Sequence, residues 1–315
     1  MSNSVPSTSF CSELAKQENE PLAGSAMTAE KYVFISWSKK LWARKQYDSQ
    51  GFPQSLTVYL QNLQKDQRIF TRLIHQHGKD RKGYSQIFVM PDGIEYRDVA
   101  VQDIELLLRE YFDGKPSENY QLGKTNGTIL FCCTHGKRDR CCAKFGQLTI
   151  YELRRLAEAR KFKLDVWECT HINADRFAVN AFVFPHGYMY GGIRVENARE
   201  IIDLLVEGYP FPPCFRGQLG LNTLEQVTQA FGHTYWYEQG IRNADVLVES
   251  VDQVSVEKCR SYVVIKDKQS EEFHARFALT LEKTDFVTYM DCDGVDANRK
   301  KLVSRWVISD STLVS

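Results

Sequence analysis

The sequence predicts a mixed α/β fold built from two similar halves. The segment PheValMetProAspGlyIleGluTyr at 88–96 returns without a gap as PheValPheProHisGlyTyrMetTyr at 182–190, an offset of 94 residues from 88 to 182. Apolar positions at helical spacing follow both copies at the same offset. A chain of 315 residues with 43% hydrophobic residues is large enough to fill several cores.

The first half alternates strand and helix patterns. Short runs of β-branched and aromatic residues predict strands, and apolar residues that recur every three or four positions predict helices. In the last of these helices, Val101, Ile104 and Leu108 lie on one face. The predicted elements are a strand at 31–36, a helix near 54–64, strands near 67–75, 85–90 and 94–98, and a helix at 101–112.

The second half repeats this order. The predicted elements are a strand at 127–132, a helix at 145–160, strands at 163–169, 178–184 and 188–193, and a helix at 195–207. The order βαβ followed by ββα is the thioredoxin-like layout, and a mixed sheet covered by helices buries runs such as IleLeuPheCys. We therefore expect two thioredoxin-like units in tandem, at 29–118 and 122–210.

The two ends of the chain have other patterns. Residues 1–28 mix Ser, Glu, Pro and Gly without periodicity, which predicts a disordered N-terminus. Residues 210–217, ProPheProProCysPheArgGly, predict a rigid connector. Residues 215–315 then predict a small α+β cap. Its elements are a short helix at 221–231 and antiparallel strands at 262–265, 273–281 and 286–290.

Charge and hydropathy exclude several classes of partner. Forty basic residues balance forty acidic ones, so no global positive charge favours nucleic acid or an anionic membrane. The chain contains no apolar run as long as the roughly 20 residues of a membrane helix, and its N-terminus has no apolar signal core. We expect a cytoplasmic protein that binds neither nucleic acid nor membrane.

The nine cysteines indicate reduced thiols and metal ligands. Their number is odd and four stand in adjacent pairs, which does not suit a disulfide framework. The scattered Cys11, Cys214, Cys259 and Cys292 are expected to be small buried apolar residues.

The block CysCysThrHisGlyLysArgAspArgCysCys at 132–142 is the strongest candidate site. It follows the apolar run 129–131, so its thiols lie where a buried strand reaches the surface, and Cys169 and His171 come later. Sulfur and imidazole ligands of this kind hold iron–sulfur clusters or zinc. The lack of a Cys-x-x-Cys motif argues against dithiol exchange, and other thiol chemistry of the adjacent cysteines stays open.

The loop between these cysteine pairs is basic. His135, Lys137, Arg138 and Arg140 could form a collar that compensates the negative charge of a metal centre and attracts an acidic partner. The alternative is a solvated loop in which Arg138 and Asp139 fix a turn.

Two motifs resemble the sucrase/ferredoxin-like family, also described as thioredoxin-like ferredoxins. They are CysThrHisGlyLysArgAspArgCysCysAlaLysPheGly at 133–146 and TrpGluCysThrHisIleAsnAlaAspArgPheAlaValAsnAlaPheValPhePro at 167–185, continued by GlyTyrMetTyrGly at 187–191. The resemblance covers about residues 30–220. It implies a [2Fe-2S] cluster held by two cysteines and by two histidines spaced His-x-x-x-His.

Carried over to this chain, the resemblance implies the ligands Cys133, Cys142 and His171, with Asp175 at the fourth position. Asp175 departs from the family pattern, which has a histidine at this position. The departure matters because a carboxylate is a harder ligand than imidazole or thiolate. Cys169 is the rival for this position, and Cys141 is a further choice.

The function implied by the resemblance is electron transfer or redox sensing. The partner would be a redox protein or a reductase, and the protein is expected to be an electron carrier rather than a catalyst with its own substrate. One alternative is a structural zinc module in which Cys133, Cys142, Cys169 and His171 complete a tetrahedron. The other is a metal-free interaction module, if Asp175 marks the loss of the cluster.

Overall fold

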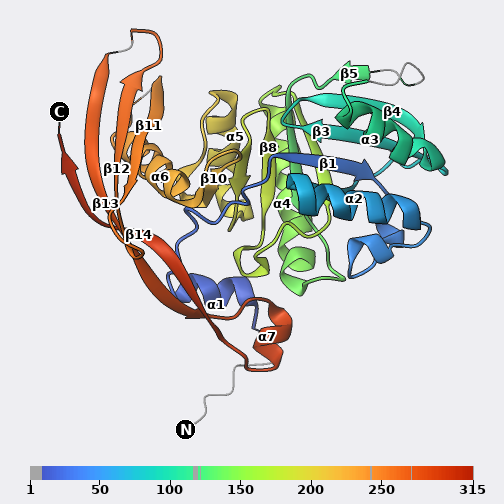
Figure 1. Ribbon diagram of the computed structural model, residues 1–315, viewed down its shortest axis with the longest axis horizontal. Helices are drawn as coiled ribbons and strands as arrows, with labels where there is room; N and C mark the ends of the chain where they lie inside the picture. Colours follow the sequence, from blue (N-terminus) through green and yellow to red (C-terminus); the bar gives the residue numbers. More distant parts are fainter. Residues whose placement is uncertain (1–8, 116–119, 121, 242, 271, 315) are drawn as a thin grey trace.

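The computed structural model describes residues 9–115, 120, 122–241, 243–270 and 272–314. Within these residues the chain forms a ten-stranded mixed sheet and a separate four-stranded antiparallel sheet, with helices packed on both (Figure 1). The predicted mixed α/β class is therefore confirmed. None of the helices in the described part of the chain is long and apolar enough to span a membrane.

The large sheet contains the strands of both halves, in the order β10-β9-β8-β6-β7-β2-β1-β3-β4-β5. The strands of the first half are β1 (Lys31–Ser36), β2 (Ile69–His75), β3 (Tyr84–Met90), β4 (Ile94–Ala100) and β5 (Leu122–Lys124). Those of the second half are β6 (Thr128–Cys133), β7 (Leu164–Cys169), β8 (Ala181–Phe184), β9 (Tyr188–Tyr190) and β10 (Phe215–Gln218).

Strand pairing follows one pattern in both halves. β1 is parallel to β2 and antiparallel to β3, and β3 is antiparallel to β4. In the same way β6 is parallel to β7 and antiparallel to β8, and β8 is antiparallel to β9. The halves join where β2 meets β7, through the pairs Ile74↔Cys169 and His75↔Glu168. The division into two thioredoxin-like units at 29–118 and 122–210 stays a prediction.

Helices cover one face of each half. The first half carries α2 (Gln54–Gln67) and α3 (Ile104–Phe112), and the second carries α4 (Arg140–Ala159) and α5 (Ala198–Val206). Each pair packs on its own strands in a buried hydrophobic core, and the core of the second half continues to α6 (Thr223–Glu238) and the C-terminal sheet. Short 3₁₀ turns lie between the main elements: η1 (Lys39–Leu41), η2 (Gln46–Asp48), η3 (Val101–Asp103), η4 (Asp175–Phe177), η5 (Val195–Asn197) and η6 (Pro212–Cys214).

The faces without helices pack against each other and form a third, aromatic core. Phe34 on β1 stacks on Phe131 of β6, with ring centroids 3.7 Å apart, and meets Phe182 and Phe184 edge-on. Because β2 and β7 share only two residue pairs, the two parts of the sheet can turn toward each other about this junction. The result is a layered arrangement of helices, strands, aromatic core, strands and helices.

The C-terminal region is a helix packed on an antiparallel sheet. The helix α6 (Thr223–Glu238) lies against this sheet at Gly232, where a Cβ atom would come within 2.5 Å of Val246. Figure 1 shows the sheet at the edge of the molecule opposite the first half. Its strands, in spatial order, are β11 (Ala244–Gln253), β12 (Lys258–Asp267), β13 (Phe273–Thr288) and β14 (Lys301–Leu313).

Several elements differ from the prediction. The prediction of disorder for 1–28 is wrong for α1 (Cys11–Gln17), whose Cys11 side chain is fully buried, while residues 1–8 lie outside the described residues. Helix α4 begins five residues earlier than predicted, because Asp139 caps it. The segment 286–290 is not a separate strand: β13 runs through most of it. The prediction also lacked β11, β14 and α7 (Cys292–Asp296).

Replacing Phe34 by Ala is expected to lower the free energy of unfolding by about 3–5 kcal/mol, because it removes a fully buried ring from the aromatic core. The measurement is guanidinium chloride unfolding followed by circular dichroism. Val58→Ala on the exposed face of α2 is the control and should change the value by less than about 0.5 kcal/mol. Equal effects of the two variants would contradict the buried interface between the halves.

Candidate metal centre

The first two predicted ligands lie at the junction of β6 and α4. Cys133 is the last residue of β6, and Cys142 lies in the first turn of α4. Both side chains are fully buried, and the Sγ atoms are 3.3 Å apart. This separation is much longer than the roughly 2.05 Å of a disulfide bond, so the two are neighbouring free thiols.

The close approach of α4 to β6 depends on Gly146. A Cβ atom at this position would lie 2.7 Å from the carbonyl oxygen of Cys133, so only glycine permits the contact. At the helix N-terminus the side chain of Asp139 accepts a hydrogen bond of 2.8 Å from the Cys141 N–H. The thiol of Cys142 lies in the first turn of this helix. Its hydrogen bond with Cys133 and its burial raise its pKa well above the usual range, although the helix dipole acts in the opposite direction.

The other two predicted ligands follow β7. The carboxylate of Asp175 is buried, and its Oδ1 atom lies 4.0 Å from Cys142 Sγ and 2.8 Å from Nδ1 of His171. The side chain of His171 is 25% exposed, so His171 lies nearer the surface than Asp175 and the cysteines. The structure thus brings Cys133, Cys142, His171 and Asp175 together in one place.

The backbone between His171 and β8 is held by Asn180. Its side-chain amide donates to the carbonyl oxygens of Asn173, at 3.3 Å, and Ala174, at 3.0 Å. Its own Oδ1 accepts a hydrogen bond of 2.8 Å from the buried Arg216 guanidinium. The main-chain carbonyl of Asn180 accepts from the N–H of Cys133, so the ligand loop is linked directly to the end of β6.

The basic loop contacts the rest of the protein at defined points. Arg138 lies against Asp175, with Nε 3.3 Å from Oδ2, and also approaches Asp291. Lys137 donates to the carbonyl oxygen of Trp42 at 2.5 Å. Arg140 pairs with Asp296. Of these three basic residues, Arg138 is therefore the one that pairs with the side chain of a predicted ligand.

The remaining member of that loop, His135, is neutral. Burial lowers its pKa to about 4. Nδ1 accepts a hydrogen bond from the N–H of His171, at 3.4 Å, and Nε2 donates to the carbonyl oxygen of Ala43, at 2.9 Å. His135 thus connects the ligand loop to the first half of the molecule.

The two rival fourth ligands lie in different surroundings. Cys169 is fully buried in the aromatic core beside Cys133, and burial raises the pKa of its thiol well above the usual range. The thiol of Cys141 points away from Cys133 and Cys142, toward Cys11 and Cys292. Cys141 therefore belongs to a different group of thiols, and the identity of the fourth ligand stays a prediction.

Cys11, Cys141 and Cys292 form a second thiol cluster. The Sγ–Sγ distances are 3.4 Å between Cys11 and Cys141, 3.3 Å between Cys141 and Cys292, and 3.6 Å between Cys292 and Cys11. Hydrogen bonds from the thiols of Cys11 and Cys292 lower the pKa of Cys141. Cys11 and Cys292 are buried, as expected, but their contact with Cys141 was not predicted, because no spacing pattern links residues so far apart in the chain.

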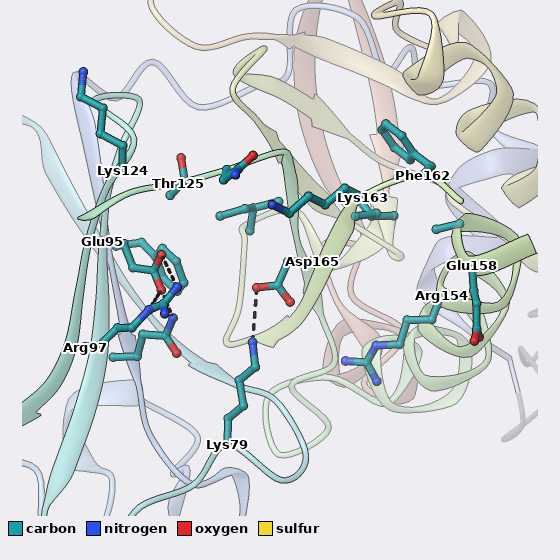
Figure 2. A pocket seen from close by; sticks show the side chains of 16 residues that line it. Lys79, Glu95, Arg97, Lys124, Thr125, Arg154, Glu158, Phe162, Lys163 and Asp165 are labelled. Atoms are coloured by element: carbon teal, nitrogen blue, oxygen red, sulfur yellow. Dashed lines mark hydrogen bonds and ion pairs between the residues drawn. The ribbon is translucent and has the colours of Figure 1, made fainter. Parts of the chain in front are cut away.

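A cleft of about 670 Å³ lies elsewhere, between β3 and β4 of the first half and α4 and β7 of the second. Figure 2 shows Lys79 reaching Asp165 and Arg97 beside Glu95, with Lys124 and Lys163 near them. The described residues that line the cleft include neither Cys nor His. Its lining is thus suited to ionic contacts, and the soft metal ligands lie outside it.

The fold and the thiol site together define a mixed α/β protein with a cysteine-rich candidate metal centre. The model of the sucrase/ferredoxin-like family matches residues 22–217, more than half of the chain, so the protein belongs to this family. This match confirms the resemblance seen in the two motifs. The comparison with curated proteins gave no match.

Two solved structures are similar to a part of the chain. One is a variant of the thioredoxin-like [2Fe-2S] ferredoxin from Aquifex aeolicus, with 17% identity and a TM-score of 0.27; the match covers 29% of this chain and 99% of the ferredoxin. The other is a structure of a thioredoxin-like [2Fe-2S] ferredoxin from the same organism, with 16% identity and a TM-score of 0.27; it covers 30% of this chain and 94% of the ferredoxin.

Proposed function

We propose that the protein is an electron carrier or redox sensor that holds a [2Fe-2S] cluster on Cys133, Cys142, His171 and Asp175. One observation carries the proposal. A buried pair of free thiols lies next to a pair formed by an imidazole and a carboxylate, with only 4.0 Å between Cys142 Sγ and Asp175 Oδ1. Membership of the sucrase/ferredoxin-like family supports it.

The donor set fits a two-iron cluster. Cys133 and Cys142 would supply two thiolates to one iron, and His171 and Asp175 would supply nitrogen and oxygen to the other. Asp175 fits the fourth position better than Cys169, because its carboxylate already touches His171 and approaches Cys142. When bound, such a cluster supplies one-electron chemistry.

The surrounding residues suit that task. The Arg138 guanidinium compensates the charge of Asp175. The helix dipole at the N-terminus of α4 acts against the hydrogen bond with Cys133 and the burial that raise the pKa of Cys142. His171 is partly exposed, which gives an outside redox protein or reductase a short route to the centre. We propose that the protein works in the cytoplasm. All nine cysteines are free thiols, and a reducing compartment keeps thiols in this state.

Replacing Cys133 or Cys142 by Ser is expected to remove most of the visible absorption of anaerobically purified protein, together with its iron and acid-labile sulfide. Each change deletes one thiolate ligand. Cys214→Ser is the matched control, because Cys214 is also buried but contacts Asn197 instead of the site. Colourless wild-type protein, after expression with ample iron and cluster-assembly capacity, would refute the proposal, whether it contains zinc at this site or no metal.

The fourth ligand can be identified by two substitutions. Asp175→Ala is expected to destroy the cluster spectrum, and Cys169→Ser is expected to leave it intact. Asp291→Ala is the control, because Asp291 also approaches Arg138 but does not contact His171. Survival of the spectrum in Asp175→Ala, with its loss in Cys169→Ser, would show that Cys169 is the ligand.

His171→Cys is expected to lower the reduction potential, by on the order of 100 mV, because a thiolate donates more negative charge than a neutral imidazole. Redox titration followed by electron paramagnetic resonance measures the change. The control is His186→Gln, a substitution between β8 and β9 beside Tyr188. An unchanged potential in a fully assembled His171→Cys cluster would argue against ligation by His171.

A further inference from the structure

Three thiols from distant parts of the chain meet at one point. Cys11 begins α1, Cys141 lies in the first turn of α4, and Cys292 begins α7. Figure 1 shows α1 and α7 side by side, below the large sheet and its helices in this view. The three Sγ atoms form a triangle with edges of 3.3 to 3.6 Å, and all three side chains are buried.

A carboxylate completes this group. Asp139 lies 3.9 Å from Cys11 Sγ through Oδ1, and one ligand atom from each of the four residues lies within 4.8 Å of the others. Its two oxygens are fixed by backbone hydrogen bonds, of 2.8 Å from the Cys141 N–H and 2.7 Å from the Cys292 N–H. Each oxygen retains a second lone pair, so the carboxylate can still bind a cation.

We infer that Cys11, Cys141 and Cys292, with Asp139, form a second metal site that binds one zinc ion. Three thiolates and one carboxylate are a four-coordinate set for Zn²⁺, and four buried residues leave no open position, as in structural zinc sites. A tetrahedron with Zn–S bonds of about 2.3 Å has S–S edges of about 3.8 Å. The observed triangle needs to expand by only a few tenths of an ångström.

The geometry argues against other uses of the three thiols. A disulfide requires sulfurs about 2.05 Å apart and would leave the third thiol unpaired. A cluster of several irons needs its ligand sulfurs spread around a much larger core than this triangle encloses. A single soft or borderline cation is the occupant that the size of the site fits.

Cationic groups offset the charge of this zinc site. Arg140 pairs with Asp296 beside α7 and donates to the carbonyl oxygen of Ser9, at 2.7 Å, ahead of α1. Arg194 donates to Ser12 Oγ at 3.1 Å, next to Cys11. Together with the N-terminus of α4, these guanidinium groups reduce the cost of four anionic ligands in a buried position.

The zinc site is separate from the proposed [2Fe-2S] centre. Cys141 and Cys142 are adjacent in the chain, but the thiol of Cys142 contacts Cys133 and that of Cys141 contacts Cys11 and Cys292. The zinc ion would fasten α1 and α7, near opposite ends of the chain, to the helix that carries a cluster ligand. Metal binding here contributes to folding, as it does in other structural zinc sites.

The test measures metal content of the full chain purified under reducing conditions from cells supplied with both iron and zinc. Wild-type protein is expected to hold about one zinc per chain, and Cys11→Ser and Cys292→Ser are expected to lose at least nine tenths of it. Both variants should keep iron and the visible cluster spectrum. Cys259→Ser is the control and should keep both metals, since Cys259 lies on β12.

The two proposals fail in different ways. Cys133→Ser is expected to lose iron and retain zinc, so loss of one centre is distinguishable from loss of the other.

A second experiment applies if Cys11→Ser or Cys292→Ser does not fold. The wild-type protein is then stripped of metal with a chelator and reloaded with Co²⁺. Thiolate-to-cobalt charge transfer and the visible bands of tetrahedral cobalt are then expected, with Cys11 and Cys292 protected from alkylation.

Several outcomes would overturn the zinc site. The first two are wild-type protein without zinc, and a zinc content that is unchanged in both Cys11→Ser and Cys292→Ser. The others are copper or iron in place of zinc at these thiols, and a disulfide between any two of them found by mass spectrometry.

Hydrogen exchange gives a further readout of the zinc site. Chelation should increase exchange in residues 9–20 and 288–299 more than in the first half, and equal protection in both forms would count against the zinc site.

Discussion

The contact between α4 and the end of β6 determines where Cys133, Cys141 and Cys142 lie, and both groups of thiols depend on these three residues. This contact exists because Gly146 has no side chain, which lets the helix approach the Cys133 carbonyl oxygen more closely than a Cβ atom would permit. Asp139 then sets the residue at which the helix begins. One turn of helix thereby directs Cys142 toward Cys133 and Cys141 toward α1 and α7. A shift in this helix would displace both groups of thiols at once.

The first half has no thiol at the position of Cys133, but it supports the ligand loops. Lys39 pairs with Glu168 on β7, and Gln46 accepts a hydrogen bond from Thr170, just before His171. The aromatic core holds this half in place, because Phe34 and Phe131 stack between the strands of the two halves. Packing energy that comes from hydrophobic burial therefore fixes the geometry of a polar site.

The sequence predicted what depends on local pattern or on resemblance. Strand periodicity and the repeat located most elements of the large sheet, and the family motifs predicted the group Cys133, Cys142, His171 and Asp175, whose side chains lie together. Helix α1 was missed because it has only 7 residues and its burial depends on tertiary contacts of Cys11. The second thiol cluster was missed for the same reason, since only the folded chain brings positions 11, 141 and 292 together.

Asp175, at the fourth position of the family motif, adds a negative charge to the site, and the guanidinium of Arg138 lies close enough to offset it. A carboxylate adds a negative charge that a neutral imidazole does not, and two thiolates already lie in the proposed centre. In a buried site such charge is costly unless a cation lies close by. Arg138 occupies that position, with its guanidinium 3.3 Å from Asp175 and its side chain still partly exposed. It therefore offsets the extra charge locally, and a carboxylate becomes an acceptable partner for His171 in this chain.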